Sequence, residues 1–127
     1  KYCENGGRVL AECGGMMYLC DTITGDDGKV YPMAGVLKQG ATMEQMKLKL
    51  GYREVRVNGQ RIRGHEFHYS RILPANEKIP VIGTIYNAKD MVVDTPVYTY
   101  KNVLASYIHF YWGECGMDHF LMLMSQK

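Results

Sequence analysis

Cys13 stands where a nucleophilic side chain could be presented to a substrate. The run Arg8–Glu12 before it is short and biased toward apolar residues, which is typical of a buried strand. Gly14 and Gly15 follow at once, and residues 16–20 are almost wholly apolar. A strand, a tight glycine turn and a helix in this order push the side chain at the turn out of the sheet. The alternative is that Cys13 is a small apolar residue at the end of a strand.

A thiol at such a turn has two local aids to catalysis. The dipole and the free N–H groups at the start of the helix favour the thiolate form of Cys13. The N–H of Gly14 can face the oxyanion that forms when the sulfur attacks a carbonyl carbon. The pattern therefore predicts Cys13 as a nucleophile and Gly14 as an oxyanion donor.

His109 is the candidate base for this thiol. It lies in the segment Ser106–Phe110, near the end of an apolar and aromatic run. A cysteine followed far downstream by a histidine is one of the recurring arrangements in which an imidazole activates a nucleophile. The alternative is that His109 is a buried histidine that hydrogen-bonds to the backbone.

The segment Gly64–Ser70 concentrates polar side chains: two imidazoles, a carboxylate, a phenol and a hydroxyl. In a strand, Glu66 and His68 share one face and could act on one substrate together. His65 and Phe67 then share the other face. The alternative is an exposed polar strand face. A metal site of His65, His68 and a third ligand is less favoured, because ligands on one face need even spacing.

The charge balance excludes several classes of partner. The chain has 127 residues, with 15 Lys+Arg against 13 Asp+Glu and a net charge of +2. This charge is too weak to favour nucleic acid or an anionic membrane. Apolar runs reach five residues at most, as in Phe120–Met124, whereas a membrane-spanning helix needs about 20. We therefore expect a single cytoplasmic domain over residues 1–127, with no export signal.

The cysteines are Cys3, Cys13, Cys20 and Cys115. An even number allows two disulfides, but secreted disulfide scaffolds are usually shorter and richer in cysteine. No Cys-x-x-Cys pair occurs that could anchor a structural zinc site. We interpret the thiols as reduced and expect no metal or cofactor to be held by this chain itself.

Periodicity and turn residues predict a lopsided α/β chain, with one strand–helix unit, several strands and a closing helix. Met46–Val57 alternates but shifts phase by one, which predicts a β-bulge near Glu54. The pair Asn58-Gly59 predicts a tight hairpin turn. The other predicted elements are strands at Arg8–Glu12, Gln60–Ile72, Val81–Tyr86, Pro96–Tyr100 and Val103–Trp112, a turn at Thr24–Gly28, a helix at Met16–Cys20 and a C-terminal helix with Met117, Phe120, Leu121 and Met124.

Four blocks of the sequence, in this order, resemble the cobyrinic acid a,c-diamide synthase family. They are Ala11–Leu19, Gly51–Glu54, Arg63–Ser70 and Ala105–His109. Each block is moderately specific, and together they extend over most of the chain. The similarity is to the C-terminal part of the family's class I glutamine amidotransferase domain.

The resemblance implies a flavodoxin-like α/β fold, here incomplete, and a glutamine-hydrolysing amide ligase. The family amidates the a and c carboxylates of the corrin ring in cobalamin synthesis, with ATP, Mg²⁺ and glutamine. Carried onto this chain, Cys13 would form a γ-glutamyl thioester, His109 would move the protons and Gly14 would give one oxyanion N–H. Glu66 and His68 would line the glutamine pocket.

The sequence departs from the wider amidotransferase pattern at two positions. Many members have His-x-Glu, whereas Tyr111 stands at the acidic position here, and many have a glutamine-binding Gln where Met17 stands here. Met17 favours the diamide synthase branch over its nearest alternative, a cobyric acid synthase-like amidotransferase. A non-catalytic binding module with the same fold is the alternative from another class.

The resemblance also implies parts that this sequence lacks. We expect the strands that would supply a second oxyanion N–H to be missing before Arg8, and residues 1–127 contain no G-x-x-x-x-G-K-[ST] phosphate loop. We therefore expect ATP and Mg²⁺ to act in a separate synthetase domain, which would also bind the corrinoid substrate. We expect the isolated chain to be inactive or nearly so, and to form homo-oligomers through an exposed sheet edge.

Overall fold

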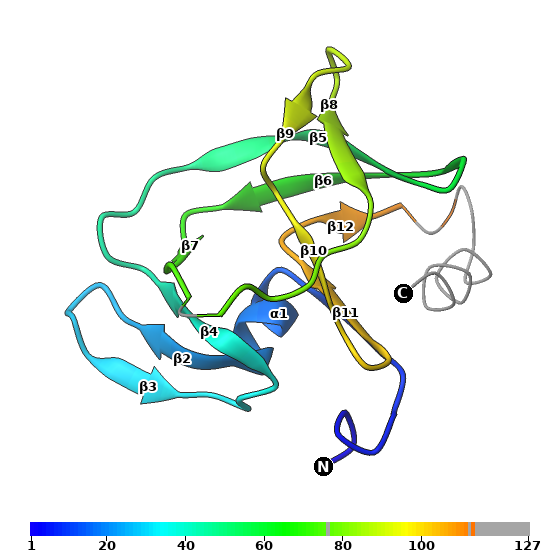
Figure 1. Cartoon of the computed structure of the whole chain (residues 1–127). Coiled ribbons are helices and arrows are strands. Elements are labelled where there is room, and N and C mark those ends of the chain that lie inside the picture. Colours follow the sequence, from blue (N-terminus) through cyan, green and yellow to red (C-terminus); the bar gives the residue numbers. More distant parts are fainter. Residues whose placement is uncertain (76, 112, 114–127) are drawn as a thin grey trace.

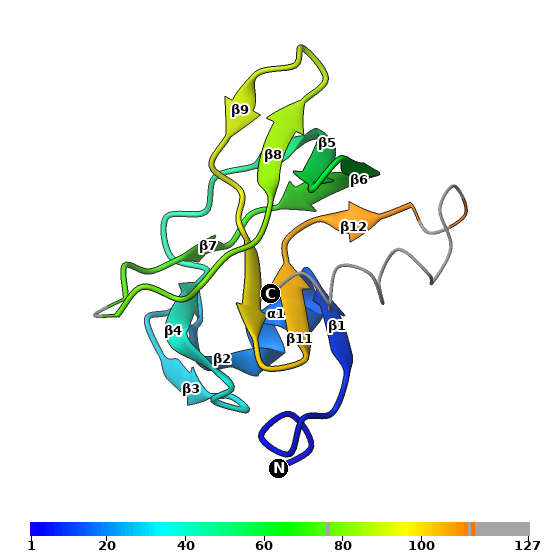
Figure 2. The ribbon, with the colours of Figure 1, turned by 45° about the vertical axis from the view of Figure 1, so that its right-hand side comes forward.

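The described part of the chain folds into three β-sheets and one short helix (Figure 1 and Figure 2). The computed structural model describes residues 1–75, 77–111 and 113. The three-stranded sheet has the order β1 (Val9–Glu12), β11 (Val103–Ser106) and β10 (Val97–Tyr100). The five-stranded sheet has the order β12 (His109–Phe110), β6 (Gln60–His68), β5 (Lys49–Val57), β8 (Thr84–Asn87) and β9 (Val92–Val93). The four-stranded sheet has the order β3 (Val30–Pro32), β2 (Cys20–Thr24), β4 (Leu37–Thr42) and β7 (Arg71–Ile72), and α1 (Gly14–Leu19) joins β1 to β2.

The three-stranded sheet lies between two apolar clusters, because alternate residues of a strand point to opposite faces. On one face Leu104 packs with side chains of the five-stranded sheet, among them Val55, Val57, Ile62, Ile85 and Phe110. On the other face Ala11 and Val103 pack with α1 and the four-stranded sheet, through Met16, Leu19 and Leu37. The middle sheet is therefore held rigidly from both sides.

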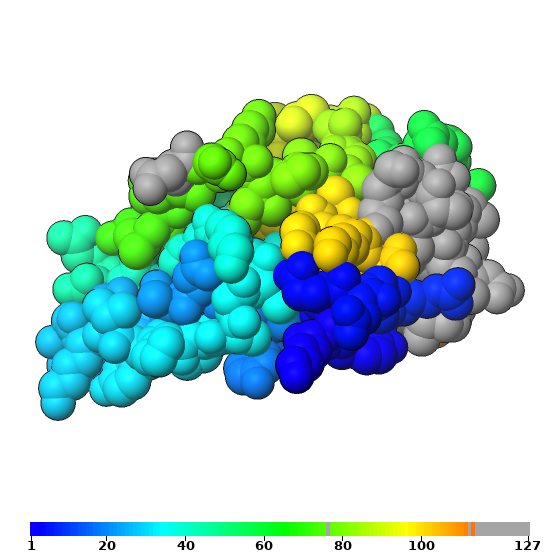
Figure 3. Space-filling model, turned by 60° about the horizontal axis from the view of Figure 1, so that its bottom comes forward, coloured from blue at the N-terminus to red at the C-terminus, as the bar shows by residue number. Residues whose placement is uncertain are grey.

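β1 and β11 are parallel neighbours although they come from opposite ends of the chain. Val9 pairs with Val103 and Glu12 with Ser106. Figure 3 shows the N-terminal residues packed against residues near 100, where Lys101 Nζ donates to the Glu4 backbone carbonyl at 2.7 Å. Because the carboxyl ends of parallel strands meet at one edge of a sheet, the segments after Glu12 and after Ser106 emerge together.

β5 and β6 form a regular hairpin, and the β-bulge predicted near Glu54 is wrong. The register runs without a break from Lys49 opposite His68 to Val57 opposite Gln60. The apolar pattern shifts phase because Leu50 lies on the exposed face of the hairpin and Val55 on the buried face. The predicted turn is confirmed, since Asn58 and Gly59 have φ of 46° and 81°, as a tight hairpin turn requires.

Other predicted boundaries need correction. The first helix ends at Leu19, and Cys20 opens β2, whose β-branched residues favour a strand. The run Val103–Trp112 is not one strand, because Tyr107 and Ile108 carry the chain from the middle sheet to the five-stranded sheet. The Ile108 N–H donates to Ser106 Oγ at 3.2 Å and fixes that bend.

Strand Gln60–Ile72 is divided into β6 and β7, and β2, β3, β4 and β9 were not predicted. The C-terminal helix and Cys115 lie outside the described residues. The mixed parallel and antiparallel sheets are compatible with an α/β amidotransferase fold. Within the described residues, no helix is both long enough and apolar enough to cross a membrane.

Candidate active site

Cys13 forms the sharp turn that the sequence predicts between β1 and α1. Its φ of 52° and ψ of −107° lie in a region that residues with a side chain rarely adopt. The Cys13 N–H donates to the Ser106 carbonyl at 2.8 Å, and the Met17 N–H donates to the Cys13 carbonyl at 3.1 Å. The strained backbone is therefore held on one side by β11 and on the other by α1.

The environment of the Cys13 thiol does not favour the thiolate. Burial raises its pKa most, a hydrogen bond from the Gly14 N–H lowers it, and the negative charge of Glu66 raises it again. The Gly14 N–H at the start of the helix does favour the thiolate, as expected, but burial raises the pKa of Cys13 by more than this hydrogen bond lowers it. A thiol with a raised pKa needs a base to become a nucleophile. The raised pKa of Cys13 therefore requires a base close to its sulfur.

His109 is the first residue of β12, opposite His65 of β6. The two imidazole rings are stacked, with centroids 5.2 Å apart and 23° between the planes. Among the described residues, no hydrogen bond joins the Cys13 thiol to the His109 ring. The two residues do follow adjacent parallel strands at the same edge, and in Figure 1 and Figure 2 β12 lies between the β5–β6 hairpin and α1. The Cys13–His109 dyad stays a prediction.

Gly64 allows β12 to approach β6 closely. A Cβ atom at Gly64 would lie 2.3 Å from the His109 carbonyl oxygen and 2.7 Å from Ile108 Cγ2. Distances below 3.0 Å are not tolerated by real Cβ atoms. Gly64 is therefore a requirement for the position of His109.

Gly64→Ala is expected to push β12 away from β6 and to displace His109. Overpacking of this kind costs about 1–3 kcal/mol of stability, and a 1 Å misplacement of a catalytic group costs about 100-fold in rate. Urea unfolding and glutamine hydrolysis in the complete enzyme measure the two effects. The control is Gly113→Ala, because a Cβ at Gly113 meets no atom of the described residues within 4 Å. Wild-type kinetics for Gly64→Ala would show that β12 does not position His109.

Glu66 and His68 lie on the buried face of β6, as the alternation predicts. His68 Nε2 and Glu66 Oε1 are 2.8 Å apart, and both residues are buried. Arg53 Nε donates to Glu66 Oε2 at 2.7 Å, and Thr95 Oγ1 donates to the same oxygen at 2.5 Å. The Glu66 carboxylate is thus the centre of a buried polar network. The alternative of an exposed polar face is wrong for these two residues.

The network keeps Glu66 ionised. Burial raises its pKa, but hydrogen bonds from His68, Thr95 and Arg53 outweigh it and lower the pKa from 4.5 to about 2. Arg53 and Thr95 were missed from the sequence because each reaches Glu66 from another strand or loop. The presence of Arg53 in the block Gly51–Glu54 was the only signal.

The network continues toward Tyr107, in the bend between β11 and β12. The rings of His68 and Tyr107 are stacked, with centroids 3.5 Å apart and 5° between the planes. Ser70 Oγ and Tyr107 Oη are 2.9 Å apart, and Ser70 Oγ is 3.3 Å from Met17 Sδ of α1. His68, Ser70 and Tyr107 therefore connect the buried carboxylate to the helix that follows Cys13.

A cavity of about 640 Å³ opens beside this network. His68, Ser70 and Tyr107 form part of its wall. The rest of the wall combines charged residues, Lys47, Lys49, Arg71 and Asp94, with apolar and aromatic ones such as Leu48 and Tyr98. Lys49 and Asp94 are paired with each other at 3.0 Å, so Lys47 and Arg71 are the charges of this wall that suit an anionic group of a small ligand.

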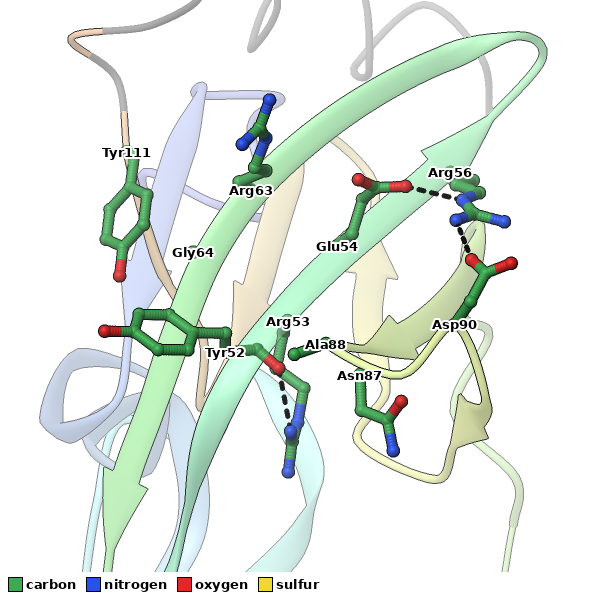
Figure 4. A pocket seen from close by; sticks show the side chains of 10 residues that line it. All are labelled: Tyr52, Arg53, Glu54, Arg56, Arg63, Gly64, Asn87, Ala88, Asp90 and Tyr111. Atoms are coloured by element: carbon green, nitrogen blue, oxygen red, sulfur yellow. Dashed lines mark hydrogen bonds and ion pairs between the residues drawn. The ribbon is translucent and has the colours of Figure 1, made fainter.

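A second cavity, of about 390 Å³, lies near the outer face of the β5–β6 hairpin (Figure 4). In Figure 4 Arg56 bridges Glu54 and Asp90, and its Nε lies 2.6 Å from Glu54 Oε1. Neither Cys13 nor His109 is among the residues that line this cavity or the larger one. In the part of the chain that the structure describes, no three His, Cys, Asp or Glu side chains gather as metal ligands.

The family model described as the CobB/CobQ-like glutamine amidotransferase domain matches residues 1–116. The chain belongs to this family. The resemblance found in the sequence is thereby confirmed. The strained turn at Cys13 is a feature of this amidotransferase domain that the sequence predicted from residue types alone.

Relatives of this amidotransferase domain include cobyrinate a,c-diamide synthases from distant organisms. That of Leptospira interrogans is 35% identical over 114 residues, which cover 83% of this chain and 25% of the relative. That of Thermoplasma volcanium is 38% identical over 120 residues, which cover 88% of this chain and 26% of the relative. That of Caldanaerobacter subterraneus is 35% identical over an alignment that covers 93% of this chain and 28% of the relative. The chain spans about a quarter of the length of these curated relatives.

Proposed function

We propose that this amidotransferase domain hydrolyses glutamine and supplies ammonia for the amidation of corrin carboxylates, as the glutaminase part of a cobyrinate a,c-diamide synthase. The carrying observation is the Cys13 turn, a strained residue between a strand and a helix in a chain of this family. The likeness to cobyrinate a,c-diamide synthases supports the acceptor class.

In the proposed reaction the Cys13 sulfur attacks the side-chain amide carbon of glutamine. His109 takes the thiol proton, and the N–H of Gly14 stabilises the oxyanion. His109 then returns the proton to the departing nitrogen, so that ammonia leaves and a γ-glutamyl thioester remains. Water, deprotonated by His109, attacks the thioester and releases glutamate and the thiol. The raised pKa of Cys13 is the reason that the base is needed.

Glu66 and His68 belong to the wall of the glutamine pocket in this proposal. Their mutual hydrogen bond is 2.8 Å long, and both are buried, so Glu66 acts by holding His68. His68 and the neighbouring Ser70 face the cavity of about 640 Å³. Lys47 and Arg71 in the same wall support the α-carboxylate of an amino acid as part of the ligand.

The remaining parts of the activity belong to the proposed complete enzyme. The fold would be the flavodoxin-like one of class I amidotransferases. A synthetase domain would use ATP and Mg²⁺ to activate the corrin carboxylate and would bind the corrinoid. Among the described strands β1 pairs with β11 alone, which supports additional pairing at its other edge in the proposed complete enzyme.

A glutamine analogue that alkylates thiols tests the nucleophile directly. 6-Diazo-5-oxo-L-norleucine is expected to label Cys13 in the complete enzyme, as peptide mass spectrometry would show, and excess glutamine is expected to prevent the labelling. A non-catalytic binding module would bind glutamine without turnover and without a covalent adduct. Labelling of Cys3 or Cys20 in place of Cys13 would contradict the proposal.

A further inference from the structure

We propose that Glu12 is a positioning residue that holds the His109 strand against the Cys13 turn, an inference that rests on the proposed function. Glu12 immediately precedes Cys13. Its Oε2 accepts a hydrogen bond from the N–H of Phe110, which immediately follows His109, at 2.5 Å. One side-chain contact therefore joins the segment of the nucleophile to the segment of the base.

The direction of the Phe110 N–H follows from the pairing of β12. The Tyr111 N–H donates to the Arg63 carbonyl at 2.9 Å, so it points toward the β6 side. Successive N–H groups of a strand point to opposite sides, and the Phe110 N–H consequently points away from β6. β12 is the outermost of the described strands of its sheet, and on that outer side Glu12 accepts the Phe110 N–H.

The direction of the Glu12 side chain follows from β1 in the same way. Leu10 packs against the apolar cluster that faces the five-stranded sheet, whereas Ala11 packs on the opposite side. Glu12 shares the face of Leu10 because residues two apart in a strand point the same way. A carboxylate bound to a backbone N–H is also stronger than a neutral pair, so this contact is a firm tether.

Glu12 acts on the backbone of β12 and not on the imidazole ring. Tyr111 stands two residues after His109, so no acid at that position can orient the ring. The backbone of β12 is fixed on one side by β6 and on the other by Glu12. Loss of the tether is expected to lower the rate of the chemical step and to leave the affinity for glutamine unchanged.

Two conservative variants of Glu12 separate the effect of side-chain length from the effect of negative charge. Glu12→Gln keeps an oxygen that can accept the Phe110 N–H, whereas Glu12→Asp keeps the charge but is one methylene shorter. We expect Glu12→Asp to lower kcat for glutamine hydrolysis about 100-fold with little change in KM. Glu12→Gln is expected to retain most of kcat. Thermal unfolding checks that each variant is folded, and the exposed Glu44→Ala is the control.

The outcomes are distinct in steady-state assays of the complete enzyme. Lower kcat in Glu12→Asp than in Glu12→Gln supports the tether, whereas the reverse order, or wild-type kcat in both, overturns it. Cys13→Ala in the same assay tests the proposed function itself. If Cys13→Ala is inactive and Glu12→Asp is fully active, only the role of Glu12 fails. If Cys13→Ala hydrolyses glutamine normally, the proposed function fails.

Discussion

Cys13→Ala is expected to abolish glutamine-dependent amide synthesis by the complete enzyme, lowering its kcat by about 10⁴-fold or more. The substitution removes the atom that forms the thioester, so neither His109 nor the oxyanion donor can replace it. Synthesis from added ammonium should survive, because free ammonia bypasses the glutaminase reaction. The measurement compares the two nitrogen sources at saturating acceptor and ATP.

Cys3→Ala is the matched control for this prediction. Cys3 is a buried cysteine that packs in the cluster beside α1, and its removal leaves the turn at Cys13 intact. Loss of both activities in a folded Cys13→Ala enzyme would count against the assigned role. Retention of glutamine-dependent synthesis would exclude Cys13 as the nucleophile.

Glu66→Ala is expected to cause the largest loss of stability. It leaves the buried Arg53 guanidinium, with 9% of its side chain exposed, without its carboxylate partner and removes the acceptor for His68. Breaking one side of a buried ion pair costs about 3–5 kcal/mol. The melting temperature should fall by roughly 10–20 °C, which calorimetry or urea unfolding measures. The exposed Glu44→Ala should stay within about 0.5 kcal/mol of the wild type.

The pH dependence of unfolding gives an independent check on Glu66. Its pKa is lowered from 4.5 to about 2, so its ionised form stabilises the fold above pH 4.5. That stabilisation is lost as the pH falls from about 4.5 toward 2. The stability difference between the wild type and Glu66→Gln should therefore shrink over this range. A difference that stays constant would show that the carboxylate charge is not the stabilising group.

The turn at Cys13 could be predicted from the sequence because all its determinants are local. An apolar strand, a cysteine, two glycines and a helix are adjacent in the chain, and φ at Cys13 confirms the strain they imply. The hairpin turn at Asn58 and Gly59 is local in the same sense. The shared face of Glu66 and His68 followed from alternation alone.

The rest depends on contacts between segments that are distant in sequence. Arg53 reaches Glu66 across a strand pair, Thr95 reaches it from a loop, and Glu12 reaches Phe110 from the far end of the chain. The false bulge near Glu54 arose because Leu50 is apolar yet exposed. Periodicity reports which residues alternate, but tertiary packing decides which face is buried.

The parallel pairing of β1 with β11 sets the order in which the molecule can be built. Val9 pairs with Val103, so nearly the whole described chain has to be synthesised before the two strands can pair. Contacts between residues so distant in sequence also form slowly. The Ser106 carbonyl, which accepts the Cys13 N–H, belongs to the same strand and takes its position in the same pairing step. A chain in which β1 and β11 have not yet paired lacks the hydrogen bond from the Cys13 N–H to the Ser106 carbonyl. The strained conformation of Cys13 can therefore be held by this hydrogen bond only after β11 has been made and paired with β1.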